Sequence, residues 1–216
     1  MAAQKPYKVV AFVDGFNLYH FIKKYRHLRQ YLWLDLIQFV KRFLPPDAII
    51  LRVLYFSAYP LWNKPKVDRH RLYVRALKSK GVEIYLGDFK ETKKTVSIND
   101  RLRLGIKSHE EKQTDVSIGV EMILSSYKDN YDIAMLISGD TDFIPPIMAI
   151  KREFPKKKIW VVVPNKKLAR PYQRLKDRQI IDKLATIKRF HLKTSQFPPE
   201  LELKSGAKIT KPEIWD

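Results

Sequence analysis

Three aspartates follow short apolar runs in this chain, and their types and spacing could support chemistry. Asp140 and Asp142 stand in the segment 133–143, IAMLISGDTDF, where five apolar residues lead directly into Ser-Gly-Asp-Thr-Asp. Asp14 follows a second apolar run, 8–13, and precedes a glycine. A short apolar run bounded by turn residues is typical of a buried strand. We therefore expect these acids at the ends of two strands, where open α/β sheets bind ligands.

A fourth acid, Asp115, begins a segment that has the pattern of a helix over 114–127. We place the apolar face of that helix at Val116, Val120, Ile123 and Tyr127, which leaves Asp115 free to face a cleft. Glu121 lies six residues further on, about 120° around a helix of 3.6 residues per turn. It should not share a ligand with Asp115, although it could reach a site from its rim.

Each of these acids also has a purely structural interpretation. Asp142 could cap a helix and Asp140 could fill a turn, because aspartate is favoured at both places. Asp115 could simply interact with the positive end of a helix dipole.

Together the four carboxylates favour an oxygen-ligated cation. Asn17, three residues after Asp14, adds a neutral oxygen, and such ligands suit Mg²⁺ or Mn²⁺. A pair of these ions can activate water and stabilise an in-line displacement at phosphorus. Other chemistries lack their motifs: the chain has no cysteine, its five histidines show no zinc spacing, and it contains neither G-x-G-x-x-G nor G-x-x-x-x-G-K-[ST].

The charge of the 216-residue chain points to a polyanionic partner. Lys and Arg number 42 against 23 Asp and Glu, a formal net charge of +19. Such an excess raises affinity for phosphate backbones through counterion release. The alternative is a basic but merely solvated surface. Tyr55, Tyr59 and Trp62 lie near the end of the next predicted strand, where they could either pack or stack on RNA bases.

The rest of the chain alternates strands and helices. Strands are predicted at 8–13, 49–57, 82–86, 133–137, 158–163 and 179–181, and helices at 18–25, 34–44, 68–80, 114–127, 143–151, 168–175 and 182–190. The least regular part, 87–112, is either a hairpin or an extended excursion. This order predicts an α/β fold with a mainly parallel sheet.

We expect one domain over 1–190, followed by an extended tail over 191–216 that packs on it through Trp215. No apolar run is long enough to span a membrane, and the N-terminus lacks the apolar core of a signal peptide. We therefore expect a soluble cytoplasmic protein that does not bind membranes. A homo-oligomer is left open.

Three motifs in this order resemble the NYN domain family, a branch of the PIN-like nucleases. They are VDGFN at 13–17, KQTDV at 112–116 and SGDTDF at 138–143, and the terminal TKPEIW at 210–215 also resembles bacterial members. The resemblance implies a Rossmann-like PIN/NYN fold and metal-dependent RNA cleavage. Its catalytic and metal-binding acids would be Asp14, Asp115, Asp140 and Asp142, and the substrate would contact Asn17, Lys112, Ser138 and Thr141. Glu121 stands where many members have aspartate.

Two other functions are considered beside this one. A phosphatase of the haloacid dehalogenase type needs a second Asp two residues after the first, where this chain has Phe16. A catalytically silent RNA-binding or regulatory module would have the same fold, and cleavage of bare RNA would distinguish it from a nuclease.

Overall fold

A seven-stranded sheet forms the centre of the molecule. The computed structural model describes residues 5–97, 103–203 and 205–215, with the backbone alone over 91–111. The strands lie in the order β4-β3-β2-β1-β5-β6-β7, and every neighbouring pair except β3–β4 is parallel. Their bounds are β1 Lys8–Asp14, β2 Ile49–Ala58, β3 Glu83–Ser97, β4 Arg103–Lys112, β5 Ile133–Ile137, β6 Lys158–Val163 and β7 Lys183–Thr186. The expected α/β fold with a mainly parallel sheet is confirmed.

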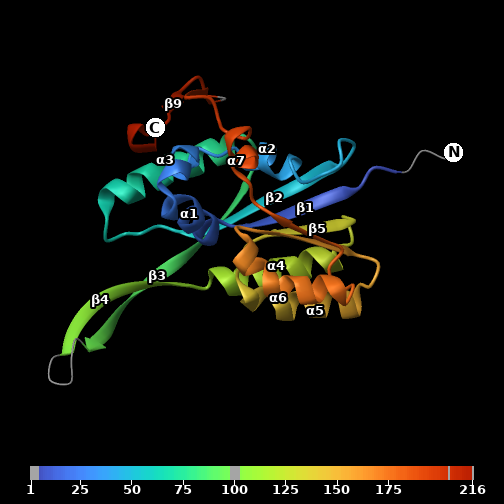
Figure 1. The fold of residues 1–216 in the computed structure, drawn as a ribbon. Coiled ribbons are helices and arrows are strands. Elements are labelled where there is room, and N and C mark those ends of the chain that lie inside the picture. Colours follow the sequence, from blue (N-terminus) through green and yellow to red (C-terminus); the bar gives the residue numbers. More distant parts are fainter. Residues whose placement is uncertain (1–4, 98–102, 204, 216) are drawn as a thin grey trace.

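Helices cover both faces of the sheet (Figure 1). One face carries α1 Gly15–Lys24, α2 Leu36–Lys41 and α3 Lys64–Ser79, and the other carries α4 Thr114–Tyr127, α5 Ile144–Glu153 and α6 Lys166–Asp177. The short helices η1 Arg26–Tyr31 and η2 Thr141–Phe143 complete the connections. The chain winds outward from β1 to β3, then resumes at β5 on the other side of β1. The winding direction therefore reverses between β1 and β5. Because the crossover connections between parallel strands are right-handed, this reversal puts the two series of helices on opposite faces of the sheet.

Residues of β1 alternate between the two cores. Val9, Ala11 and Val13 pack under α1–α3, whereas Val10 and Phe12 pack under α4–α6. All five are fully buried, which explains why the segment reads as an unbroken apolar run. Because side chains alternate along a strand, Asp14 continues the series of Val10 and Phe12 and faces α4.

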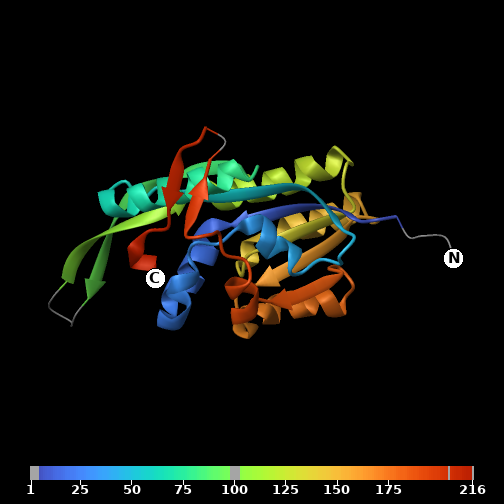
Figure 2. The ribbon, with the colours of Figure 1, turned by 90° about the horizontal axis from the view of Figure 1, so that it is seen from above.

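The third strand is much longer than the five residues expected for it. β3 runs on to Ser97 and pairs with β4 as an antiparallel hairpin, from Asp88 opposite Lys112 to Ser97 opposite Arg103. The irregular segment is therefore a hairpin, which projects from the body of the molecule in both views (Figures 1 and 2).

The end of the chain differs from two local expectations. The segment 179–181 is not a strand: Gln179 has a positive φ of 57° just after α6, and the last strand of the sheet is β7. Residues 182–190 do not form the expected helix, because β7 occupies 183–186 and only the short α7, Arg189–Lys193, follows. A turn thus replaces the strand expected at 179–181, and the short strand β7 replaces most of the helix expected at 182–190.

The last residues carry structure of their own rather than a plain extended tail. β8 Glu200–Glu202 and β9 Lys208–Thr210 form a two-stranded hairpin, followed by η3 Glu213–Trp215. The Trp215 ring lies 6.1 Å from the Trp33 ring and 6.2 Å from the Tyr73 ring, measured between centroids. The C-terminal segment thus packs on the α1–α3 face.

Helix α4 has the predicted bounds but buries a different face. Val116 and Tyr127 are 71% and 68% exposed, so the predicted apolar stripe is wrong. The buried positions include Ile118 and Met122. Asp115 is exposed in the first turn.

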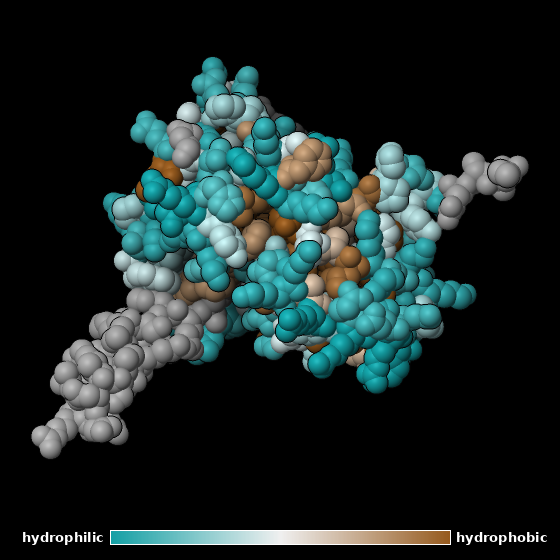
Figure 3. Space-filling view, viewed as in Figure 1, coloured by the Kyte–Doolittle hydropathy of each residue, from teal (hydrophilic) through white to brown (hydrophobic). Residues whose placement is uncertain are grey.

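The surface of the view in Figure 3 is mainly hydrophilic, with hydrophobic residues in patches between polar side chains. Among the helices of the described residues, none has the length and apolar character that crossing a membrane requires.

Candidate active site

The end of β1 and the turn after β5 meet at the reversal point of the sheet. Ser138 directly follows β5, and its Oγ donates a hydrogen bond to Oδ2 of Asp14 at 2.8 Å. Both side chains are buried, with Asp14 only 3% exposed. Crevices outside the carboxyl ends of strands at such reversal points are the usual ligand sites of open α/β sheets. The fold therefore places a buried carboxylate where a ligand is expected.

Asp14 and Asn17 hold this junction together. Oδ1 of Asp14 accepts a hydrogen bond from the backbone N–H of Asn17 at 2.9 Å and caps α1. Oδ1 of Asn17 in turn accepts from the backbone N–H of Gly139 at 3.1 Å. The oxygen proposed as a neutral ligand thus tethers the β5 turn to the first turn of α1.

The β5 turn is closed by its own polar groups. The backbone N–H of Asp140 donates to Oγ of Ser138 at 3.1 Å, and Oδ1 of Asp140 accepts from the backbone N–H of Asp142 at 3.0 Å. The Tyr172 hydroxyl, from α6, donates to the Asp140 carbonyl. Asp140 therefore caps η2, whereas the structural interpretation placed the cap at Asp142 and Asp140 in the turn. The hydrogen bonds of Ser138 also connect Asp140 to Asp14.

Sequence reasoning missed Tyr172. Its side chain is fully buried, and burial raises its pKa, as do the nearby carboxylates of Asp140, Asp14 and Asp142. Nothing in the local pattern of α6 marks this tyrosine as part of the site, because its role depends on a turn more than 30 residues away.

Two glycines allow the backbone to approach closely at this junction. A Cβ on Gly15 would lie 2.3 Å from Cε2 of Tyr55 and 2.7 Å from the Phe56 carbonyl oxygen. A Cβ on Gly139 would lie 2.5 Å from Cδ1 of Leu168. These distances are shorter than van der Waals contact, so the strand ends fit together only without side chains at these positions.

Asp115 approaches the other acids from α4. Gly87 on β3 permits this, because a Cβ there would lie 2.7 Å from both the Lys112 carbonyl oxygen and Oγ1 of Thr114 at the start of α4. The surrounding protein excludes part of the water from the Asp115 carboxylate, which raises its pKa although the residue is exposed, and Asp140 and Asp142 raise it further. The four aspartates are hereafter called the acidic cluster. Asp115 and Asp140 lie within electrostatic reach of Asp14, and Asp140 and Asp142 lie within reach of Asp115.

The pKa of Asp14 is raised chiefly by burial and less by its acidic neighbours. Burial raises its pKa to about 6, and the carboxylates of Asp115 and Asp140 add to the rise, although the hydrogen bonds from Asn17 and Ser138 oppose it. A bound cation would relieve this repulsion.

The carboxylate oxygens of the acidic cluster are the ligand type that Mg²⁺ and Mn²⁺ use. Among the described residues, no three Asp, Glu, His or Cys side chains stand close enough together to hold an ion directly. Mg²⁺ usually keeps several waters and is bound through one or two carboxylates. Asp14 accepts two hydrogen bonds and Asp140 accepts one. Because a carboxylate has about four lone-pair positions, both keep positions that a cation could use.

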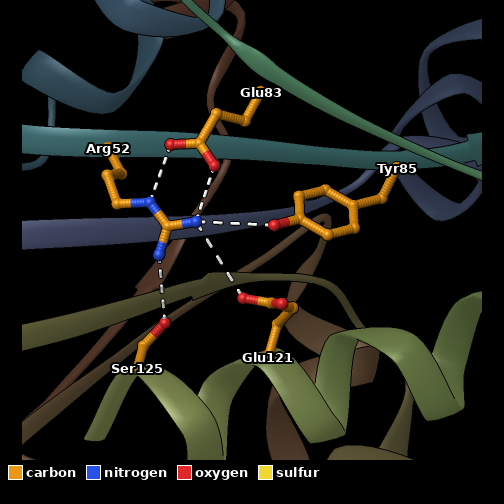
Figure 4. Close-up of polar contacts among 5 residues, drawn as sticks. All are labelled: Arg52, Glu83, Tyr85, Glu121 and Ser125. Carbon is orange, nitrogen blue, oxygen red and sulfur yellow. Dashed lines mark hydrogen bonds and ion pairs between the residues drawn. The ribbon is translucent and has the colours of Figure 1, made fainter. Parts of the chain in front are cut away.

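Glu121 does not join the acidic cluster. It points to Arg52 on β2, whose guanidinium binds Glu83 through two hydrogen bonds of 2.7 and 2.6 Å (Figure 4). The Glu121 carboxylate lies 4.0 Å from that guanidinium, and Tyr85 and Ser125 complete the group. Arg52 pairs with Val10, four residues before Asp14, so this ion-pair group lies nearer the amino edge of the sheet.

The remaining predicted contacts lie on the surface around the cluster. Thr141 and Asp142 are exposed in η2, and Lys112 is exposed at the end of β4. Nothing in their geometry assigns a ligand to them, and their roles stay predictions.

A second feature, an aromatic pocket, lies on the α1–α3 face, and Gly15, the residue after Asp14, contributes to its lining. Its volume is about 230 Å³. Its aromatic lining residues are Phe16, Tyr19, Tyr55, Trp62, Tyr73, Phe89 and Trp215. Two histidines, His20 and His70, and three basic residues, Lys23, Lys66 and Arg69, also line it. Burial lowers the pKa of His70 to about 4. Tyr55 and Trp62, for which packing and base stacking were both considered, thus share one hollow.

This fold and these strand-end acids define an α/β protein of the PIN-like nuclease fold class. Residues 8–185 match the model of the NYN domain, and the chain belongs to that family. It is also similar to 6-hydroxy-3-succinoylpyridine 3-monooxygenase HspA of Pseudomonas putida, with 25% identity over 195 residues that cover 74% of this chain and 61% of that protein. The chain thus spans about three fifths of that relative's length. No solved structure matches the chain significantly.

Proposed function

We propose that the protein hydrolyses RNA phosphodiester bonds with the help of Mg²⁺ or Mn²⁺. The observation that carries this proposal is the hydrogen-bonded junction of Asp14 with the Ser138–Asp142 turn, which gathers carboxylates at the ligand-binding edge of the sheet. The net charge of +19 supplies the attraction for a polyanion. Membership of the NYN family supports the same reaction.

The residues of the chain would divide the work between binding and orientation. Asp14 and Asp140 would hold the cation, with Asp115 and Asp142 adding negative charge around it. When bound, the cation supplies Lewis-acid stabilisation of the phosphate and lowers the pKa of water. Asn17 and Ser138 keep Asp14 and the β5 turn in register, and the basic surface holds the RNA.

A catalytically silent RNA-binding module is the second candidate. It is favoured by the hydrogen bonds that the carboxylates of Asp14 and Asp140 accept from the backbone N–H groups of Asn17 and Asp142. In that case the acids would serve as caps and turn residues only.

The relative from P. putida suggests a small-molecule alternative. Its name specifies a substituted pyridine as substrate, and the aromatic pocket of this chain suits a planar heteroaromatic ring. This alternative concerns the pocket and would leave the acidic cluster without a catalytic role.

Cleavage of RNA of mixed sequence tests the proposal. The purified protein is incubated with the RNA in Mg²⁺, in Mn²⁺ and in excess chelator, and the products are resolved by length. We expect cleavage in the presence of either metal and none with chelator. Binding without cleavage under all three conditions would instead support the silent module.

A further inference from the structure

We propose that the aromatic pocket holds one nucleobase of the RNA and so places the adjoining phosphate at the acidic cluster. This inference takes its ligand from the proposed function, but it concerns a different surface and can fail separately.

The pocket has a buried floor and an exposed aromatic rim. Tyr55 and Tyr73 are nearly fully buried, whereas Phe16 and Trp62 are 37% and 45% exposed. The Trp62 and Phe89 rings pack edge to face with centroids 4.7 Å apart. Exposed rings at the mouth of a hollow contribute little to the core, and they are the feature on which bases stack.

The size of the pocket fits one planar ring system. Its volume of about 230 Å³ lies below the range of roughly 300–1,000 Å³ that is usual for sites of drug-sized ligands. One base can enter while the sugar and phosphate remain outside.

The charge around the pocket fits a phosphate chain. Lys23, Lys66 and Arg69 line it, and its lining contains no acidic residue within the described part of the chain. Lys23 and Lys66 lie near His20. Burial lowers the pKa of the His20 imidazole, and the charges of these two lysines lower it further. A neutral apolar ligand would not need these cations, whereas a nucleotide is both aromatic and anionic.

The position of the pocket links it to the acidic cluster. Gly15 lines the pocket and follows Asp14 directly, and consecutive Cα atoms are about 3.8 Å apart. Asp14 faces α4, and Gly15 packs on the Tyr55 ring on the other side of the sheet edge. In this proposal the base lies against Tyr55 on one side of the sheet edge, and its phosphate lies over that edge, toward Asp14 on the other side.

Binding measured in chelator tests the pocket without cleavage. A fluorescently labelled RNA octamer is compared with a base-free ribose-phosphate octamer of the same charge by fluorescence anisotropy. Base–aromatic stacking changes affinity by roughly 5- to 150-fold per base, so the parent should prefer the base-containing octamer by at least about 5-fold. Trp62→Ala and Phe16→Ala should reduce this preference, whereas Trp62→Phe should retain most of it.

Phe190→Ala is the matched control, because Phe190 is an aromatic residue on α7 that is 62% exposed and does not line the pocket. It should leave the preference unchanged, and the melting temperatures of all variants should match the parent. An unchanged preference in Trp62→Ala would overturn the inference. A second pair of results would also overturn it: free pyridine-3-carboxylate binds in a manner that requires Trp62, while the affinity for RNA depends neither on the bases nor on Trp62.

The two proposals fail in different ways. Base-dependent RNA binding through Trp62 in a protein that cleaves no RNA would refute hydrolysis and support the pocket. Metal-dependent cleavage with no preference for bases would refute the pocket and support hydrolysis.

Discussion

Ser138 donates a hydrogen bond from its Oγ to the buried Oδ2 of Asp14, joining two residues 124 positions apart. The same Oγ accepts from the backbone N–H of Asp140. One hydroxyl therefore connects the end of β1 with the turn after β5 and partly compensates for the burial of a carboxylate.

Ser138→Ala should destabilise the protein by about 1–3 kcal/mol, because it leaves one buried carboxylate oxygen and one backbone N–H without a partner. Urea denaturation at pH 7 measures the change in the free energy of unfolding. Ser117→Ala is the control, since Oγ of Ser117 donates a local hydrogen bond to the carbonyl of Gln113, the residue before α4, at an exposed position. An equal effect of the two substitutions would mean that the Ser138–Asp14 bond contributes nothing.

The two glycines Gly15 and Gly119 should respond oppositely to alanine. Gly15→Ala would force a Cβ against the Tyr55 ring and the Phe56 carbonyl, and overpacking of this kind costs about 1–3 kcal/mol. At Gly119, inside α4, the nearest atom would be at 3.5 Å, so alanine should be neutral or stabilise by up to about 1 kcal/mol. Thermal denaturation of both variants checks this, and a stable Gly15→Ala protein would show that the junction is looser than its contacts indicate.

His70 should make stability depend on pH. Burial lowers its pKa from 6.5 to about 4 in the folded protein, so the unfolded chain binds this proton first as the pH falls. Above pH 6.5 the histidine is neutral in both states and costs no stability. Between pH 6.5 and 4 the free energy of unfolding should fall by about 3 kcal/mol, because only the unfolded chain binds the proton.

Comparison with His70→Gln isolates this effect, because the opposite contribution of Asp14, whose pKa is raised, is common to both proteins. Urea denaturation at several pH values should show the parent losing about 3 kcal/mol relative to the variant from pH 6.5 to 4. A difference that stays constant with pH would contradict the account of His70.

RNA binding should weaken strongly with salt and depend little on sequence. We expect the dissociation constant for a single-stranded RNA to rise at least about tenfold between 50 and 200 mM salt, because phosphate contacts release counterions. Lys66→Ala should lower the slope of log K against log salt by about 0.7, the contribution of one phosphate contact. Anisotropy titrations in chelator measure both quantities, and salt-independent binding would exclude a phosphate-dominated interface.

The fold could be predicted where sequence patterns are local. The bounds of β6 and α4 match the expected ranges, because short apolar runs and helical periodicity depend on nearby residues. The buried face of α4 could not be predicted, since apolar residues occur around most of the helix and only contact with the sheet selects Ile118 and Met122. The last strand was misplaced because the positive φ of Gln179 depends on the turn after α6.

The candidate site shows the same division. The acids Asp14 and Asp140 stand at strand ends, where the pattern alone indicates a site. The contact between Tyr172 and Asp140 joins residues more than 30 positions apart, and the hydrogen bond between Asn17 and Gly139 joins residues more than 100 positions apart. Local sequence patterns do not indicate such contacts. Glu121 lies beside Arg52 and away from the acidic cluster. This contact could not be predicted, because only the folded sheet brings the two residues together.

Asp140→Asn provides the most direct test of metal-dependent hydrolysis. The asparagine oxygen can still accept from the N–H of Asp142, and losing one charge relieves repulsion within the acidic cluster, so without metal the variant should melt no lower than the parent. It should lose the rise in melting temperature that Mg²⁺ gives the parent. Asp47→Asn, at an exposed turn before β2, is the control and should behave as the parent in both respects.

The decisive measurement is the rate of RNA cleavage by Asp140→Asn relative to the parent at the same Mg²⁺ concentration. Changes to groups that only support metal ligands cost about 10- to 100-fold in activity, so removing a ligand charge should lower the rate at least about 100-fold. Cleavage at the parent rate by the folded variant would show that the acidic cluster is not the catalytic site.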